Sequence, residues 1–389
     1  MSRLDELIAE LCPNGVENKT LNEVCNIFAG GDVPKASMSK EMTQEFTVPI
    51  ISNGIGENAF YGYTDTAKIT VPAVTIAARG TIGYAEYRDY PYFPIVRLLS
   101  AIPKDTSVLN TRFLYFCLQG KNYKVPTSGI PQLTAPELKK VEIPVPPLEV
   151  QREIVRILDS FTLLTAELTA ELTARKQQYQ YYLNCFFETQ TDNLVPLESI
   201  GTLTRGKRFV HADATDTGVP CIHYGELYTY YGVHASAVKS HIREDLRPKM
   251  RYAHKGDVII VGAGENNIDI GVGVAWEGNE DVAVHDACYT LKHSQNSKYI
   301  SYYLRSDMYH SQIKKYVSEG KICSISAAGL GKAMIPIPSL SEQQRIVSIL
   351  ERFDVLCNDL SSGLPAEIEA RQKQYEYYRD KLLTFKQLA

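Results

Sequence analysis

The sequence predicts an α+β protein made of two tandem α/β domains with substantial β-sheet, each followed by a long helical segment. Three observations lead to this fold class. One block of sequence occurs twice along the 389-residue chain. After each copy, apolar residues recur every three or four positions, which is typical of amphipathic helices. The remaining stretches alternate short β-rich segments with glycine-containing turns.

The repeat is clearest where each helix is expected to begin. Pro144-Val-Pro-Pro-Leu148 matches Pro336-Ile-Pro-Ser-Leu340, and the match continues from Gln151 and Gln343 at a constant offset, 343 − 151 = 192. Farther along, residues 174–182 match 370–378 at an offset of 370 − 174 = 196. Solenoid repeats have periods of about 20–50 residues, so a repeat of this length indicates two duplicated domains.

The first helical segment is unusually long. Its apolar stripe predicts a helix over about residues 149–187, which is about 58 Å long at about 1.5 Å per residue. A small domain cannot bury such a helix, so the stripe needs a partner helix, and the second copy supplies one. Residues 361–365 (Ser-Ser-Gly-Leu-Pro) should kink or break that copy. The side chains predicted to pair the helices or to meet partner proteins are Ile154, Ile157, Phe161, Leu168, Leu172, Tyr179, Ile346, Ile349, Phe353 and Tyr375.

Composition favours an ordinary globular protein. The net charge of −4 does not by itself indicate a nucleic-acid binder, so any affinity for DNA must come from a local basic surface or from a partner. No stretch reaches the ~20 apolar residues of a membrane span, and the acidic N-terminus is unlike a secretion signal. We therefore expect a cytoplasmic protein. The eight cysteines form no C-x-x-C pair and are interpreted as packing residues.

Motifs of catalysis are absent from the sequence. There is no G-x-x-x-x-G-K-[ST] phosphate loop, no H-E-x-x-H zinc motif and no nucleophile elbow. Residues 258–264 resemble the start of a dinucleotide-binding motif, but Asn267 stands where the third glycine belongs and a strand-like pattern follows. His285 and Asp286 would face opposite ways on a strand, so we do not expect an acid–base pair. The sequence therefore favours a non-catalytic protein.

The chain resembles the specificity subunits of type I restriction-modification systems along essentially its whole length. The resemblance rests on the opening segment from Leu11 to Leu21, the two duplicated helix starts, and the tandem units Thr165-Ala-Glu-Leu168 and Thr169-Ala-Glu-Leu172. It implies two target-recognition domains, residues 1–147 and 189–340. A long antiparallel two-helix coiled coil, formed by residues 148–188 and 341–389, would separate them.

The resemblance also implies a function and partners. Each domain would read one half of a split target in double-stranded DNA, and the helices would dock two adenine-N6 methyltransferase subunits. The complete assembly would add up to two ATP-driven restriction subunits. The chain itself would catalyse nothing and hold no metal or cofactor, because S-adenosylmethionine, ATP and magnesium would belong to the partner subunits. No contact with a membrane is implied.

Candidate DNA-contacting residues lie in basic or glycine-flanked segments. Residues 205–255 hold nine Lys and Arg against five Asp and Glu, with five of the eight histidines. Such a segment suits phosphate contact, although a solvated surface is the ordinary alternative. Exposed polar loops can also reach base edges in a groove. The predicted residues are Lys35, Asn53, Arg79, Thr81, Ser128 and Gln132 in the first domain, and Arg205, Lys207, Arg208, His223, Tyr224, Asn266, Asn267 and Lys321 in the second.

Three other functions stay open at this stage. The same module could serve a methylation-only or type II-like system, which neighbouring genes would reveal. The chain could instead be a coiled-coil adaptor for protein or glycan, which predicts no DNA binding. An autonomous nuclease or methyltransferase would show activity as a purified chain supplied with cofactor.

The number of Thr-Ala-Glu-Leu units predicts the spacing of the two half-sites. Each unit adds four residues, or about 6 Å of helix, and half-sites on one face of DNA lie about 34 Å apart per turn. We expect that adding or deleting one unit changes the unread spacer by about one base pair and leaves both half-sites intact. Methylation-motif mapping checks this, and a changed half-site sequence would count against a ruler.

Overall fold

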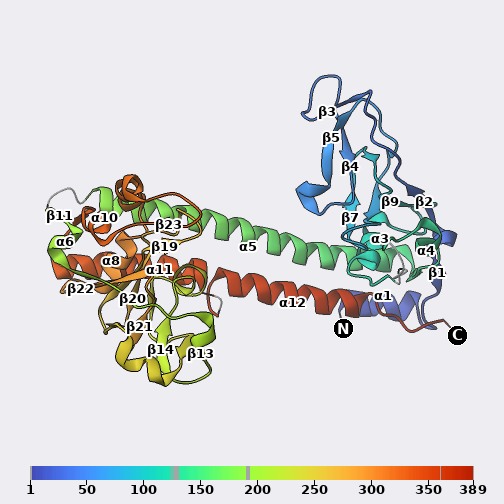
Figure 1. Ribbon diagram of the computed structural model, residues 1–389. Coiled ribbons are helices and arrows are strands. Elements are labelled where there is room, and N and C mark those ends of the chain that lie inside the picture. The colour runs from blue at the N-terminus through green and yellow to red at the C-terminus, as the bar shows by residue number, and fades with distance from the viewer. Residues whose placement is uncertain (1, 124, 126–130, 190–192, 360, 389) are drawn as a thin grey trace. The chain divides into compact units, whose positions relative to one another are not determined.

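The chain folds into two compact units. The computed structural model describes residues 2–123, 125, 131–189, 193–359 and 361–388. Unit 1 comprises Met1–Glu167 and Ile368–Ala389, and unit 2 comprises Leu168–Glu367 (Figure 1). Each unit therefore combines one globular part with helical segments from both halves of the sequence. The predicted boundaries after residues 147, 188 and 340 separate globular from helical parts and stay predictions.

The described residues of unit 1 form two four-stranded sheets and a strand pair. The first sheet is antiparallel in the order β2-β9-β6-β7, and the second has the order β3-β5-β4-β8, in which only β4 and β8 are parallel. Strands β1 and β10 pair separately. The bounds are β1 Asn18–Thr20, β2 Cys25–Ala29, β3 Met38–Ser39, β4 Val48–Ile51, β5 Phe60–Thr64, β6 Ala73–Ile76, β7 Ala85–Arg88, β8 Phe93–Pro94, β9 Leu99–Pro103 and β10 Glu142–Pro144.

Unit 2 repeats this sheet plan. Its sheets have the orders β12-β22-β18-β20-β15 and β13-β16-β14-β21-β17, and β11 pairs with β24 as β1 pairs with β10. An extra pair, β19 with β23, follows the central strands. The bounds are β11 Leu194–Pro196, β12 Gly201–Arg205, β13 Ala214–Thr215, β14 Val219–Ile222, β15 His234–Ala235, β16 Ser240–Ile242, β17 Tyr252–Ala253, β18 Val258–Val261, β19 Ala263–Gly264, β20 Gly273–Trp276, β21 Val282–Val284, β22 Cys288–His293, β23 Cys323–Ser324 and β24 Met334–Pro336.

The short helices cap and cover these sheets. In unit 1, α3 packs on β6 and β7, and in unit 2, α8 packs on β18 and β20. Asparagine caps both: the side-chain oxygens of Asn110 and Asn296 accept backbone N–H groups of the first turns of α3 and α8. The bounds are α1 Arg3–Leu11, α2 Leu21–Val24, α3 Thr111–Leu118, α4 Ala135–Lys139, α6 Leu197–Ile200, α7 Glu226–Thr229, α8 Ser297–Tyr303, α9 Asp307–Ile313 and α10 Ala327–Gly331.

The long helices match the sequence prediction. Helix α5 runs without a break from Leu148 to Glu188, 41 residues. The second copy is split into α11, Leu340–Asn358, and α12, Leu364–Leu382. The predicted break at residues 361–365 is therefore confirmed, and proline at the second position of α12 explains why the helix restarts there.

Each unit pairs a helix segment from one repeat with a helix segment from the other. In unit 1, α12 runs antiparallel to the first part of α5 (Figure 1), and Phe161 stacks on Tyr378 with ring centroids 5.5 Å apart. In unit 2, Phe353 of α11 meets Tyr182 of α5 at 5.4 Å. Phe161 and Phe353 are equivalent in the repeat, as are Tyr182 and Tyr378, so the same contact is made twice with the copies exchanged.

A buried glutamine ties each helix start to the globular part. The Gln151 side chain is fully buried; it donates to the carbonyls of Val108 and Pro146, both at 2.7 Å, and accepts the Asn110 amide at 2.8 Å. Gln343 accepts the Asn296 amide at 3.0 Å and donates to the Pro338 carbonyl at 2.9 Å. Buried polar groups need such partners, which explains why glutamine occurs in both copies.

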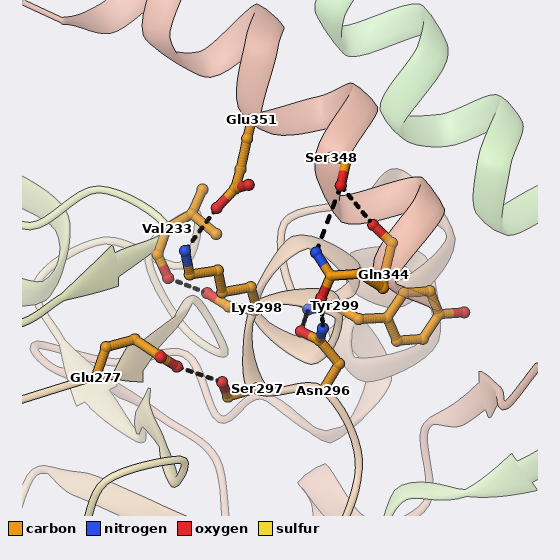
Figure 2. Close-up of polar contacts among 10 residues, drawn as sticks. Val233, Glu277, Asn296, Ser297, Lys298, Tyr299, Gln344, Ser348 and Glu351 are labelled. Carbon is orange, nitrogen blue, oxygen red and sulfur yellow. Dashed lines mark hydrogen bonds and ion pairs between the residues drawn. The ribbon is translucent and has the colours of Figure 1, made fainter. Parts of the chain in front are cut away.

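An ion pair also attaches each globular part to its long helix. Lys298 of α8 pairs with Glu351 of α11 at 2.6 Å (Figure 2), and the equivalent residues Arg112 and Asp159 pair at 2.8 Å in unit 1. Figure 2 also shows Asn296 donating to Gln344, which further joins the start of α8 to α11. Both globular parts are thus attached to their helices by an equivalent buried glutamine and an equivalent ion pair.

Most of the predicted helix-pairing residues lie in these interfaces. Ile154, Ile346 and Tyr375 are buried, and Ile157, Phe161, Tyr179, Ile349 and Phe353 are partly buried. Leu168 and Leu172 are also partly buried; like Ile349 and Phe353, they belong to no core cluster within the described parts of the chain. These two leucines lie in the Thr-Ala-Glu-Leu units, where the division between unit 1 and unit 2 also falls.

Tyr179 does not repeat the contact made by its equivalent, Tyr375. The Tyr375 hydroxyl bonds to the Gln119 side chain, whereas the residue equivalent to Gln119 in unit 2 is Arg305. There Tyr179, Arg305 and Asp354 line a cavity of about 1040 Å³. The Arg305 guanidinium donates to the carbonyls of Gly232 and Gly273 at 2.7 and 3.2 Å. The two units therefore share a framework but differ at this position, where unit 1 has a hydrogen bond and unit 2 has a cavity.

Candidate nucleic-acid interface

Asn53 brings the predicted loops of unit 1 together. Its side-chain oxygen accepts the Ala78 amide at 2.7 Å, and its side-chain nitrogen donates to the Val96 carbonyl at 2.6 Å. The Thr81 hydroxyl donates to the Asn53 carbonyl at 2.9 Å. The loops after β4, β6 and β8 therefore meet at one place. Both polar atoms of the Asn53 amide are used in holding these loops together. Asn53 is therefore a positioning residue, and its amide is not free to bond to a base.

Arg79 and Gln132 also meet in this cluster. The Arg79 guanidinium donates to the Gln132 side-chain oxygen at 3.0 and 2.6 Å, and the Leu133 amide bonds to the Ala78 carbonyl at 2.9 Å. Lys35 is exposed, and within the described residues its side chain makes no hydrogen bond or ion pair. Ser128 lies outside the described residues. Contact of these residues with DNA stays a prediction.

Unit 2 builds an equivalent cluster around His285. The Lys207 backbone bridges to His285 as Gly31 bridges to Ile95 in unit 1. The His285 ring lies 4.6 Å from the ring of His223, 5.5 Å from Tyr224 and 4.9 Å from Phe209. Two predicted residues, His223 and Tyr224, thus form a half-buried aromatic cluster beside the exposed Lys207 and Arg208.

Glycine is needed at an equivalent position in each unit. A Cβ on Gly30 would lie 2.8 Å from the Pro94 carbonyl oxygen, and a Cβ on the equivalent Gly206 would overlap the carbonyls of Val284 and His285. In each unit one loop thus passes so close to its neighbour that a side chain does not fit.

Burial favours the neutral form of the two clustered histidines. Burial lowers the pKa of His223, and burial together with the neighbouring His223 ring lowers the pKa of His285. The His285 Nε2 atom lies 3.1 Å from the Phe209 carbonyl, and Nδ1 accepts the Ala287 amide at 3.1 Å. These contacts correspond to a neutral ring protonated at Nε2.

The expectation that His285 and Asp286 face opposite ways is wrong. Strand β21 ends at Val284, so both residues lie in a turn, and Nδ1 of His285 is 3.4 Å from the Asp286 carboxylate. The alternation rule applies to strands only. Both His285 nitrogens already interact with backbone groups, so we interpret the pair as structural.

Much of the basic segment over residues 205–255 is internally paired. Arg243 pairs with Asp213 at 3.1 Å, Arg247 pairs with Glu244, and Lys255 donates to Asn279 at 2.9 Å. Arg205 donates to the Asp286 carbonyl at 2.6 Å. By contrast, the side chains of Lys207 and Arg208 are exposed and make no ion pair or hydrogen bond with any described residue. These two remain the strongest candidates for phosphate contact in unit 2.

Asn266, Asn267 and Lys321 lie on a neighbouring pair of loops. All three are exposed, and the Asn267 side chain donates to Glu319 at 3.1 Å. The Ile325 amide bonds to the Gly262 carbonyl at 2.9 Å, as the Leu133 amide bonds to Ala78 in unit 1. Equivalent loops therefore meet in both units, although their side chains differ.

Sequence patterns missed one turn in the unit 1 cluster. Val96 and Arg97 follow β8 and both have positive φ, 53° and 60°. The turn carries none of the glycine, asparagine or aspartate residues that mark such turns, so no pattern indicated it. Phe209 was missed for a similar reason, since an isolated phenylalanine between polar residues gives no sign that it packs on two histidines.

Metal sites and membrane-spanning helices are characteristic of other classes of protein. In the described parts of the chain, no cluster of His, Cys, Asp and Glu side chains is arranged to hold a metal ion. Within the same residues, none of the helices combines the length and apolar character that crossing a membrane requires.

Comparison with known proteins identifies the family. The family model described as the type I restriction modification DNA specificity domain matches twice, over residues 13–175 and 193–370. The chain belongs to this family. Its two matches follow the internal repeat, so each half of this chain is one copy of the domain. The resemblance stated from sequence motifs is thereby confirmed.

Individual relatives agree with this assignment. A chain of Haemophilus influenzae named as a type I restriction enzyme specificity subunit is 35% identical over 95% of this chain and 96% of its own length. The specificity subunit of the Escherichia coli enzymes EcoR124I and EcoR124II is 34% identical over 64% of this chain and 63% of its own length.

Solved structures share the fold. A structure reported for the assembly and conformational transition of the type I restriction-modification system matches with a TM-score of 0.61 at 16% identity, over 96% of this chain and 98% of the other. The S subunit of M. genitalium matches with a TM-score of 0.53 at 15% identity, over 95% and 96% of the two chains. At these identities the likeness shows the fold: two tandem domains with long helices.

Acidification should destabilise unit 2 selectively. All eight histidines lie between residues 211 and 310, and burial lowers the pKa of His223, His234, His285, His293 and His310. Because their folded pKa lies below the unfolded value of about 6.5, the unfolded state binds more protons as pH falls through this range. The stabilisation is fully present above about pH 6.5 and is lost below it.

The single tryptophan, Trp276, lies in β20 and is 2% exposed, so its fluorescence reports on unit 2. We expect its thermal unfolding midpoint to fall between about pH 7.5 and about pH 5.5. A His223→Asn, His285→Asn double variant should weaken this dependence. An unchanged midpoint across the range would contradict the assignment of neutral histidines.

Proposed function

We propose that this chain is the subunit that selects the DNA sequence for a type I restriction-modification complex, with each unit reading one half of a split target. The observation that carries the proposal is the duplicated loop cluster. Both units bring equivalent loops together with equivalent backbone contacts, while the exposed side chains differ. A reader of two different half-sites needs this combination of one scaffold with two surfaces.

The chemistry of the clusters fits binding better than catalysis. In unit 1 the exposed polar groups include Lys35, Thr81 and Arg97, and in unit 2 they include Lys207 and Arg208. Cationic and amide groups contact phosphates and base edges. We propose that the chain catalyses nothing and holds no cofactor. S-adenosylmethionine, ATP and magnesium would be bound by partner subunits, and the whole complex would act on DNA in the cytoplasm.

The helices offer a duplicated surface for a duplicated partner. Tyr181 and Tyr377 are equivalent in the repeat and are 65% and 62% exposed. Leu163 and Val355 are likewise equivalent and are 61% and 51% exposed. Large apolar side chains exposed in matching places favour docking of two copies of one protein. We propose that these copies are adenine methyltransferase subunits, and that up to two restriction subunits join the complete assembly.

A methylation-only system is the second candidate. It uses the same two clusters and the same helix surface, and differs only in lacking restriction subunits. Genes beside the one that encodes this chain would distinguish the two assemblies.

Mapping DNA methylation tests the proposed function directly. Host DNA is compared with and without this chain, while the partner methyltransferase is present in both cultures. We expect a split motif with methylated adenines only when the chain is present. An unchanged methylome, obtained while the same methyltransferase is active with another specificity chain, would overturn the proposal and favour a protein adaptor.

Substituting the exposed tyrosines tests the docking surface. Removing a large aromatic side chain from the centre of an interface costs about 1–3 kcal/mol, or about 10–100-fold in affinity. We expect Tyr181→Ala or Tyr377→Ala to weaken one of two methyltransferase positions, and the double variant to weaken both. Native mass spectrometry of mixed subunits measures the stoichiometry.

Tyr230→Ala is the matched control for this experiment, because Tyr230 is 58% exposed but lies in the globular part of unit 2. Its complexes should keep two methyltransferase copies. Two copies bound to the Tyr181→Ala, Tyr377→Ala double variant with unaltered affinity would place the docking surface elsewhere.

A further inference from the structure

Unit 1 contains a turn in an unfavourable backbone conformation. Val96 and Arg97 have φ angles of 53° and 60°, and the Leu98 amide bonds to the Ile95 carbonyl at 3.0 Å. Two successive left-handed residues closed by this hydrogen bond form a type I′ turn, which favours glycine, asparagine or aspartate. A β-branched valine is a steric outlier in this conformation. The surrounding structure must therefore hold the turn in place.

Two neighbouring segments hold the turn through three hydrogen bonds. The Val96 amide donates to the Gly31 carbonyl at 2.9 Å, and the Arg97 amide donates to the Gly30 carbonyl at 3.2 Å. The Asn53 side chain donates to the Val96 carbonyl at 2.6 Å. Strained backbone that neighbouring groups over-determine in this way is characteristic of functional sites. The same Asn53 connects the turn to Ala78 and Thr81, so the turn belongs to the loop cluster of unit 1.

The turn leaves its arginine free. The other arginines of residues 12–147 have partners: Arg79 bonds to Gln132, Arg88 to Glu86 and Arg112 to Asp159. The Arg97 side chain is exposed and makes no hydrogen bond, ion pair or ring contact with any residue that the structure describes. Its five N–H donors are therefore available to a ligand.

Unit 2 presents a different side chain from the same position. The Cys288 amide bonds to the His285 carbonyl at 2.9 Å, as Leu98 bonds to Ile95. Asp286 and Ala287 thus stand where unit 1 has Val96 and Arg97, and neither has a positive φ. The closing hydrogen bond is shared, so the two turns occupy equivalent places but differ in backbone conformation and in the side chains that they expose. Two domains that read different half-sites must differ at positions of this kind.

We propose that Arg97 is a specificity-determining residue of the first domain and reads a guanine in its half-site. The inference rests on the proposed function and adds a residue and a base to it. A guanidinium donates two parallel hydrogen bonds to O6 and N7 of guanine, and this contact requires a fixed direction. A backbone held by three hydrogen bonds from two neighbouring segments supplies that direction, whereas a phosphate contact tolerates a flexible side chain.

The test compares methylation motifs directed by the full complex with wild-type chain, Arg97→Ala and Arg97→Lys. With Arg97→Ala we expect one guanine position in one half-site to become degenerate, with methylation at other bases there rising about tenfold or more. The other half-site and the spacer should stay unchanged. Arg97→Lys should also be degenerate, because an ammonium group cannot make the paired contact.

Two control variants separate base reading from folding. Arg3→Ala removes an exposed arginine of the same unit and should leave the motif intact. Val96→Asn keeps Arg97 and introduces a residue suited to the left-handed conformation, so the motif should again be intact. Retention of the guanine with Val96→Asn and its loss with Arg97→Ala would assign the selectivity to the guanidinium.

Two results would overturn the inference. In the first, the Arg97→Ala complex keeps the motif but methylates every site more slowly by the same factor, and the Arg97→Lys complex has the wild-type rate and motif. This result would indicate a phosphate contact. The other is an Arg97→Ala complex with unaltered rate and motif. A wild-type chain that directs no split motif would instead remove the proposed function, so the two failures are distinguishable.

Discussion

The structure depends on the burial of one apolar stripe that occurs twice in the chain. A single amphipathic helix of 41 residues cannot cover its own apolar face. The stripe is buried in two portions, the first against α12 and the second against α11. Because each portion packs on a helix from the other repeat, the stacking of Phe161 on Tyr378 is repeated by Phe353 and Tyr182. Neither globular part has a complete helical support without the distant half of the sequence.

The attachment of the globular parts follows from the same constraint. Gln151 and Gln343 bury their amides at the two helix starts and satisfy backbone groups of the preceding loops. The ion pairs Arg112–Asp159 and Lys298–Glu351 hold α3 and α8 against those helices. A buried amide left without its partners costs about 1–3 kcal/mol, so these contacts are difficult to vary. The exposed side chains of the loop clusters, such as Lys35 and Lys207, are not buried and are free of this energetic constraint.

The difference between buried framework contacts and exposed loop side chains explains how one fold supports different binding surfaces. The framework contacts of the loop clusters are largely backbone hydrogen bonds, such as those to Ala78 and Gly262, which do not depend on residue type. The side chains on that framework differ between the units: unit 1 has Asn53, whose amide also joins neighbouring loops, and Arg97, where unit 2 has Tyr224 and Ala287. Burial in the aromatic cluster of unit 2 lowers the pKa of His223 and of His285, whereas unit 1 contains no histidine.

The sequence by itself determined the repeat, the helix from about residue 149 to 187, its broken second copy and the family. Those features are local or periodic, since apolar spacing, proline and glycine act over a few residues. Only the tertiary structure decided which helix segments pair, that Asn53 is occupied with neighbouring loops, and that His285 lies in a turn beside Asp286. It also placed Arg97 on a strained turn. These outcomes depend on contacts between residues far apart in the chain, such as Asn53 with Val96, and no local pattern encodes them.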